Sequence, residues 1–311
     1  MPAIITNKFR INNSEQFHES FTESSPNIYY LGLARPQAYG TSTRGDGRTD
    51  YEGTDANPVI PSDTVVTEFT TFDDLLAAKK IASSDVSFAI PRRNWTTVTT
   101  YDIYRHYYGE FVTGSTSTKN TANGGATTLH DANFYVLTTD RNIYKCIDND
   151  GNTASTTEPT GTGNAVITTA DGYKCKYMYT MSASQQSNFL STDFMAVSTN
   201  STVSSAAIDG SIDCIRIKSA GSGGTNVTHS VTIKGDGSSA TANVVVAGGI
   251  ITEVTMTNVW SGYTFGTVSN AEIVTAGATN LTGAELDVII SPKGGHCFNA
   301  CLLYTSPSPR D

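Results

Sequence analysis

Residues 171–181, with the sequence DGYKCKYMYTM, alternate with a period of two. Tyr173, Cys175, Tyr177, Tyr179 and Met181 point to one side, and the two lysines between them point to the other. Successive side chains leave a β-strand on opposite faces, so the pattern predicts a half-buried strand. Its packed face would consist mostly of tyrosine, and both core packing and contact with another protein are open for that face.

Length, composition and charge limit the class of protein. The chain has 311 residues, which is enough for two domains, and Thr, Ser, Asn and Gly are abundant. This composition favours short strands and polar turns over helical bundles. The formal net charge of −9 argues against a nucleic-acid binder, which would carry a basic face.

The sequence contains no apolar run near the roughly twenty residues needed to cross a bilayer. The start, MPAIITNKFRINNSEQF, has polar residues where a signal peptide would be apolar, so we expect synthesis in a cytoplasm and no membrane insertion. Four widely separated cysteines have no metal-ligand spacing and are expected to be buried thiols: Cys146, Cys175, Cys214 and Cys297.

Residues 1–200 are expected to form a mainly β, sandwich-like domain with an α+β N-terminal part. Short helices are predicted near 14–22, capped by Asn13 or Ser14, and near 72–82, capped by Thr71. In addition to 171–181, the predicted strands include 3–11, 27–36, 101–112, 133–138 and 142–147.

Residues 203–290 form a second region that is rich in Gly, Ser and Thr and is predicted to be an inserted or appended all-β module. The segment 231–256 reads as a meander with a hairpin turn at Gly248 and Gly249. A weak internal repeat relates 215–225 to 254–264, which predicts two related β units packed together.

The last residues have a different character. The segment 301–311, CLLYTSPSPRD, back-translates to a DNA string that resembles the transposase end and adapter used in sequencing libraries. We therefore expect 301–311 to be adapter-derived and 291–300 to begin a truncated C-terminal part.

A search for chemistry finds no catalytic elbow, phosphate loop, zinc-protease motif or dinucleotide fingerprint. The stretch 148–152, DNDGN, begins like a calcium loop, but Thr153 and Pro159 occupy the positions that need Gly and Glu. The sequence therefore predicts no enzyme, no cofactor and no metal site.

The segment 89–95, AIPRRNW, places two guanidinium groups beside an indole. Arg and Trp are enriched at interface hot spots, so Arg92, Arg93 and Trp95 are candidate interaction residues. An arginine can also hold carbonyls of its own chain with its fork of donors, and this alternative is equally open.

At this segment the chain resembles a known family, the baseplate wedge subunit of T-even-type contractile-tailed bacteriophages. The resemblance covers roughly 3–195, and residues 203–290 fall outside it. Cys175 stands where the family tends to have Trp. The matching segments, in order, are IITNKFR, NIYYLGLARPQAY, DDLLAAKKIASSDVSFAIPRRNW, NIYKCIDN, TEPTG and DGYKCKYMYTM, and SPKGGHCFNA looks like a return to the family chain.

The resemblance implies a virion structural protein of the tail baseplate, made in the host cytoplasm and without catalytic residues. It would form a homodimer and join other wedge proteins, hold the baseplate before contraction and take part in its rearrangement. The tyrosine face of Tyr173, Tyr177 and Tyr179 would then serve core or subunit packing.

An alternative function comes from the 203–290 module. A tail-fibre or adhesin protein could recognise host-surface glycan there, with Trp260, Tyr263 and Phe265 stacking on sugars. The same side chains could instead pack the β units together, and the sequence leaves both possibilities open.

Overall fold

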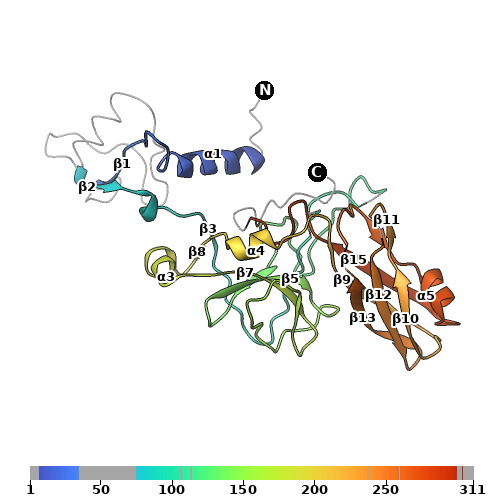
Figure 1. Ribbon diagram of the computed structural model, residues 1–311. Coiled ribbons are helices and arrows are strands. Elements are labelled where there is room, and N and C mark those ends of the chain that lie inside the picture. The colour runs from blue at the N-terminus through green and yellow to red at the C-terminus, as the bar shows by residue number, and fades with distance from the viewer. Residues whose placement is uncertain are drawn as a thin grey trace. The chain divides into compact units, whose positions relative to one another are not determined.

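Antiparallel strands dominate the fold, which confirms the predicted mainly β class (Figure 1). The computed structural model describes residues 7–34, 75–105, 107–112, 114–237, 239–258, 260–299 and 303. The chain divides into two compact units, Met1–Ser87 and Phe88–Asp311.

The first unit joins a helix to a two-stranded ribbon. Helix α1 (Asn7–Glu19) is followed by β1 (Tyr29–Ala34), and β2 (Leu75–Ile81) precedes the short 3₁₀ helix η1 (Ser83–Asp85). The ring of Phe17 lies 5.2 Å from the rings of Phe21 and Tyr29, which are 4.7 Å apart. These three rings pack the end of the helix against the start of the ribbon.

Both predicted helices of this unit require correction. The helix expected near 14–22 begins already at Asn7, so the expected caps lie inside it and the strand predicted over 3–11 is wrong from Asn7 onward. The helix expected near 72–82 is wrong for its described part, because Leu75–Ile81 is strand β2, and residues 71–74 lie outside the described residues. The good helix formers of this segment pair antiparallel with β1 from Tyr29 to Ala34, so tertiary pairing overrides local propensity.

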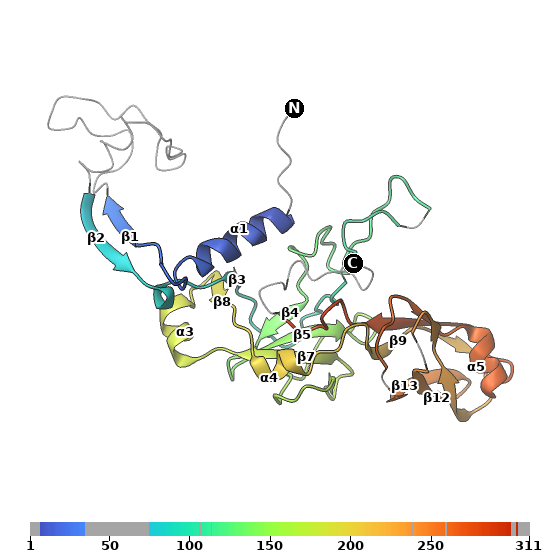
Figure 2. The ribbon, with the colours of Figure 1, turned by 45° about the horizontal axis from the view of Figure 1, so that its top comes forward.

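The second unit contains a four-stranded sheet that we call the tyrosine sheet (Figure 2). Its strands are β4 (Tyr135–Leu137), β5 (Asn142–Asp148), β7 (Lys174–Thr180) and β6 (Ile167–Thr168), in that spatial order. Strand β3 (Ala89–Pro91) pairs with β8 (Phe194–Ala196), and two short helices follow the sheet, α3 (Ala183–Phe189) and α4 (Ser201–Ser205). The strands predicted at 27–36, 133–138, 142–147 and 171–181 are therefore confirmed.

The strand predicted at 101–112 is wrong within the described residues, where only Phe111 forms a bridge, to Lys119. Alternate amides reach different segments, with Asp102 N donating to Asn133 O and Tyr104 N to Cys146 O. No single neighbouring strand satisfies the backbone, so no ladder forms.

The tyrosine sheet packs on a core that is rich in aromatic side chains. Tyr135, Tyr144, Tyr177, Tyr179 and Phe134 are all buried in one cluster. Leu303, in the segment predicted to be adapter-derived, is buried in the same cluster, and the origin of that segment stays a prediction.

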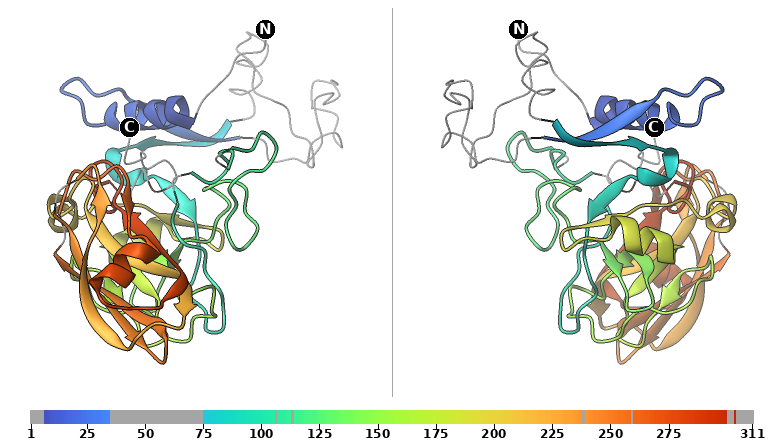
Figure 3. Two further views of the ribbon diagram at one scale, coloured as in Figure 1. Left: turned by 90° about the vertical axis from the view of Figure 1, so that its right-hand side faces the viewer. Right: turned by 90° about the vertical axis from the view of Figure 1, so that its left-hand side faces the viewer.

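The remaining strands form the β module, defined here as β9 to β15, residues 212–290 (Figure 3). A three-stranded sheet has the order β10 (Val227–Thr232), β12 (Thr241–Ala247) and β13 (Ile250–Asn258). Strand β9 (Ile212–Ser222) pairs with β15 (Thr282–Ile290), and β11 (Lys234–Gly235) pairs with β14 (Gly266–Thr267). Gly248 and Gly249 have φ of 63° and 83°, the left-handed values that a tight hairpin turn needs, so the predicted meander is confirmed.

Helix α5 (Asn270–Ala276) packs on the outside of the β module (Figure 3). Ser269 and Glu272 form a capping box, and Lys234 of β11 pairs with Glu272 at 2.7 Å. The two segments of the predicted repeat contribute to different strands, β9 and β13, which belong to different sheets of one core cluster. The relation between them stays a prediction.

Candidate interaction surfaces

The arginines of the segment 89–95 hold loops of their own chain. Arg93 donates from Nη2 to His130 O at 3.2 Å and from Nη1 to Ala132 O, and its guanidinium lies 5.1 Å from the ring centre of Tyr135. Arg92 donates to Ser191 O at 3.0 Å. These contacts are those of a clamp, the second of the two interpretations left open by the sequence.

Trp95 is half-buried beside the aromatic core. Its Nε1 donates to Ser155 Oγ at 3.2 Å, and Ser155 donates in turn to Asp171 at 3.0 Å. The hydrogen bonds of Ser155, Thr156 and Thr157 to Asp171 lower the pKa of this carboxyl, although partial burial opposes them. The indole therefore fixes the connection that precedes β7.

The three candidate tyrosines of β7 are buried, each at 4% exposure or less. Tyr173 donates to Thr153 O at 2.5 Å, and Tyr179 donates to Ala196 O at 2.9 Å. Tyr177 shares a hydrogen bond of 2.6 Å with Thr180 Oγ1. Their side chains form core contacts in this chain, and burial raises the pKa of Tyr173 to about 12.

The aromatic group of the β module is divided between core and surface. Tyr263 is fully buried, and its hydroxyl accepts a hydrogen bond from Ala240 N at 3.1 Å. Trp260 and Phe265 are 46% and 47% exposed. Only these two remain available for a contact outside the chain.

The second face of the tyrosine sheet carries charge and meets the β module. Lys174 lies 3.5 Å from Asp148, and Lys176 lies 2.5 Å from Asp213 of β9. Arg216 of β9 reaches Asp148 at 3.4 Å. We call these five residues the ionic interface, and they couple the two regions because each charge is largely removed from water.

Lys145 lies beside the ionic interface and is completely buried. Its Nζ donates to His296 O at 2.7 Å and sits 4.3 Å from the ring centre of Tyr104. Burial lowers the pKa of Lys145 to about 8, because the charged form is desolvated. Burial also raises the pKa of Asp148, although Lys174 and Arg216 oppose this shift.

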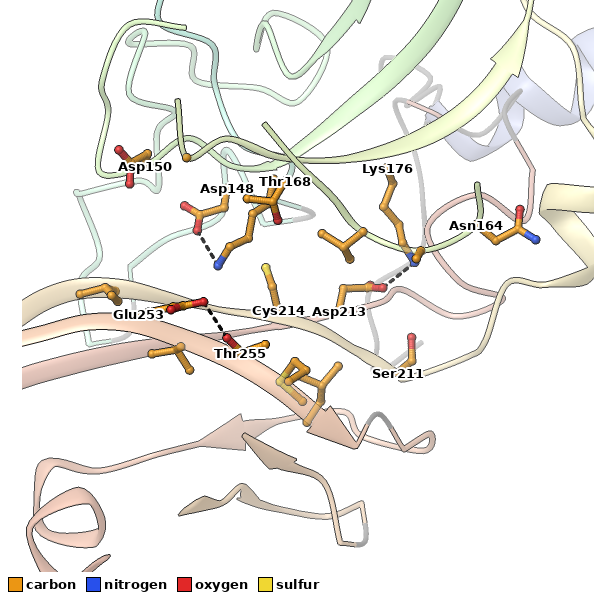
Figure 4. Close-up of a pocket in the computed structure, with 18 of the residues that line it drawn as sticks. Asp148, Asp150, Asn164, Thr168, Lys176, Ser211, Asp213, Cys214, Glu253 and Thr255 are labelled. Atoms are coloured by element: carbon orange, nitrogen blue, oxygen red, sulfur yellow. Dashed lines mark hydrogen bonds and ion pairs between the residues drawn. The ribbon is translucent and has the colours of Figure 1, made fainter. Parts of the chain in front are cut away.

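A pocket of about 630 Å³ opens beside the ionic interface (Figure 4). Its walls come from the segment 164–168, from the start of β9 and from residues 252–256 of β13. Sequence reasoning identified the opposite face of β7 only as the one that carries Lys174 and Lys176. The partners of these lysines lie on β5 and β9, so no local spacing indicates the pocket.

Within the described ranges, no group of three or more His, Cys, Asp or Glu side chains is arranged to hold a metal ion. No helix in that part of the chain is long and apolar enough to cross a membrane.

Comparison with known families identifies the first half of the chain. Residues 3–148 match the phage Gp8 family, described as bacteriophage T4 Gp8, and no curated protein matches the chain. The protein is thus a structural protein of a bacteriophage tail baseplate. More particularly, residues 3–148 are those of a T4-type baseplate wedge subunit of the Gp8 family, which confirms the predicted resemblance. The match ends at the last residue of β5, earlier than the 195 expected from the sequence, and leaves the β module outside.

Proposed function

We propose that the protein forms a homodimer and joins other wedge proteins, holds the baseplate before contraction and takes part in its rearrangement. The family match over 3–148 carries this proposal. The protein would be made in the host cytoplasm, act in the virion tail and perform no catalysis. The pairing of the charged groups at the ionic interface is consistent with a structural role.

The ribbon of β1 and β2 is the best candidate for the contact surface. Leu31 and Leu33 are 57% and 63% exposed on one face of β1, and Leu76 of β2 is 66% exposed. A two-stranded ribbon alone is marginally stable in water, and exposed apolar side chains in one place favour association. The ribbon lies within the segment matched by the family.

Light scattering coupled to size exclusion tests the assembly. The wild-type chain should be a dimer at micromolar concentration and should co-purify with co-expressed wedge proteins. The double change Leu31→Asp and Leu33→Asp should yield a monomer, because it places charge in the contact. The matched control Ile250→Asp, at an exposed position of the β module, should leave assembly unchanged. A wild-type monomer that captures no wedge protein would refute the proposal.

A second candidate function is recognition of host-surface glycan by the β module. The exposure of Trp260 and Phe265 favours it, because exposed aromatic rings can stack on sugar rings. A glycan array probed with the whole chain tests this function. Binding that disappears in Trp260→Ala and persists in Phe111→Ala, another exposed aromatic position, would support it.

A further inference from the structure

The pocket beside the ionic interface has the size and shape of a small-molecule site. Its volume of about 630 Å³ lies within the range of roughly 300–1,000 Å³ that such sites occupy. Most of its lining lies beyond residue 148, so the inference does not depend on the family match or on the proposed function.

The lining of the pocket is acidic. Four carboxylates, Asp148, Asp150, Asp213 and Glu253, face two lysines, which leaves a formal charge of −2. Both lysines are engaged, Lys174 by Asp148 and Lys176 by Asp213. Asp150 and Glu253 have no ion pair among the described residues, so the field in the pocket favours a cation.

A buried acceptor in the pocket lacks a hydrogen bond. Asp148 is only 5% exposed, and its Oδ1 accepts no hydrogen bond from the described residues. The closest cation on that side, Arg216 Nε, is 3.4 Å away, which is longer than a normal N–H···O bond. Figure 4 shows Asp148 entering the pocket from the tyrosine sheet and Glu253 from β13 on the opposite side. An N–H donor in the pocket would satisfy the buried oxygen.

The pocket also has apolar walls, which limits the kind of cation. Val166, Ile212, Ile217 and Met256 contribute aliphatic surface between the carboxylates. A hydrated metal ion gains nothing from such walls, whereas methylene groups bury against them. We propose that this pocket binds an alkylammonium ligand, an aliphatic chain that carries primary ammonium groups. A free polyamine and the side chain of a lysine from a neighbouring chain share this chemistry.

Calorimetry on the whole chain at low salt tests the site with three probes: spermidine, N-acetyl-lysine methylamide and Mg²⁺. Spermidine should bind at one site at least about tenfold more tightly than Mg²⁺, which corresponds to burying about two methylene groups. Acetyl-lysine amide as tight as spermidine would indicate a lysine side chain as the natural source. Acetyl-lysine amide that is much weaker would indicate a free polyamine, and either ranking supports the site.

Variants locate the binding. Glu253→Gln keeps the shape of the side chain and its acceptor for Thr255, so it should fold and weaken spermidine binding about two- to fivefold, as the loss of one exposed charge pair predicts. Asp150→Asn provides a second variant at the exposed rim. The matched control Glu110→Gln, exposed and outside the pocket, should bind like wild type. The proposal is overturned if spermidine does not saturate, if Mg²⁺ binds as tightly, or if Glu253→Gln and Glu110→Gln behave alike.

Discussion

The tyrosine sheet and the β module are both antiparallel, yet they hold their connecting segments in different ways. Around the tyrosine sheet, buried hydroxyls donate to carbonyls of distant segments: Tyr135 to Pro91, Tyr144 to Gly161, Tyr173 to Thr153 and Tyr179 to Ala196. In the β module, hairpins pair neighbouring strands, and the core consists mostly of Val, Ile, Ala and Leu.

The difference teaches why one region needs so many tyrosines. Long connections with little regular structure leave backbone carbonyls that no adjacent strand satisfies. A tyrosine fills the core with its ring and reaches such a carbonyl with its hydroxyl. Where hairpin ladders satisfy the backbone, aliphatic side chains suffice.

Removal of a whole anchoring ring should have the largest effect. Tyr179→Ala should lower the free energy of unfolding by about 3–5 kcal/mol, as truncation of large buried aromatic side chains does. Urea denaturation followed by tyrosine fluorescence measures this change. Tyr30→Ala, at a position that is 65% exposed, should change the stability little. Equal effects of the two changes would contradict the role of Tyr179 in the core.

The buried amine beside the ionic interface should impose a pH dependence. The folded pKa of Lys145, about 8, lies below its ordinary value of 10.5, so the unfolded chain binds more protons between these values. Stability should therefore rise through this window, by about 3 kcal/mol from this group. The rise should be absent in Lys145→Met and present in Lys293→Met, whose side chain is exposed. Urea midpoints from pH 7 to 11 measure it, and parallel curves for wild type and Lys145→Met would refute it.

The β module should be sensitive to added volume rather than to lost anchors. A Cβ at Gly237 would lie 2.3 Å from the ring of the buried Tyr263, so this glycine is needed for the close approach. Gly237→Ala should cost about 1–3 kcal/mol, the usual range for overpacking. Gly248→Ala is not a matched control because of its left-handed φ, whereas Gly163→Ala, with open space around it, should be tolerated. Thermal unfolding compares the two variants.

The smallest effect should come from a single hydroxyl. Tyr144→Phe removes the bond of 2.7 Å to Gly161 O and should cost about 1 kcal/mol. Hydrogen exchange should become faster in the connection between β5 and β6. Tyr177→Phe is the matched control, because its hydroxyl bonds only Thr180 on its own strand. Equal exchange in that connection for both variants would remove the anchoring argument.

The sequence predicted those parts of the fold that depend on local patterns. The alternation at 171–181 and the Gly-Gly turn both act over a few residues, and both predictions are confirmed. The helix predicted near 72–82 was wrong because its partner strand, Tyr29–Ala34, lies far away in the chain. Hairpin signals cannot indicate a pairing across so long a connection.

The contacts of the candidate residues were less accessible. Arg93 was recognised as a possible clamp, but the identity of the loop at 130–132 depends on the tertiary fold. Likewise, Asp148 and Glu253 meet in one pocket only because β5 and β13 come together in the second unit. Spacing along the chain carries no trace of such an encounter.

The two ends of the β module meet at one point, and this has a consequence for how the protein arose. Ser291 N donates to Ser211 O at 2.8 Å, and the hydroxyls of the two serines are 3.0 Å apart. A chain that enters and leaves a region through adjacent residues can acquire or lose that region by a single recombination event, with little disturbance of its host. The β module thus has the geometry of an exchangeable cassette, and a direct Ser211-to-Ser291 junction is the natural starting point for grafting another domain at this position.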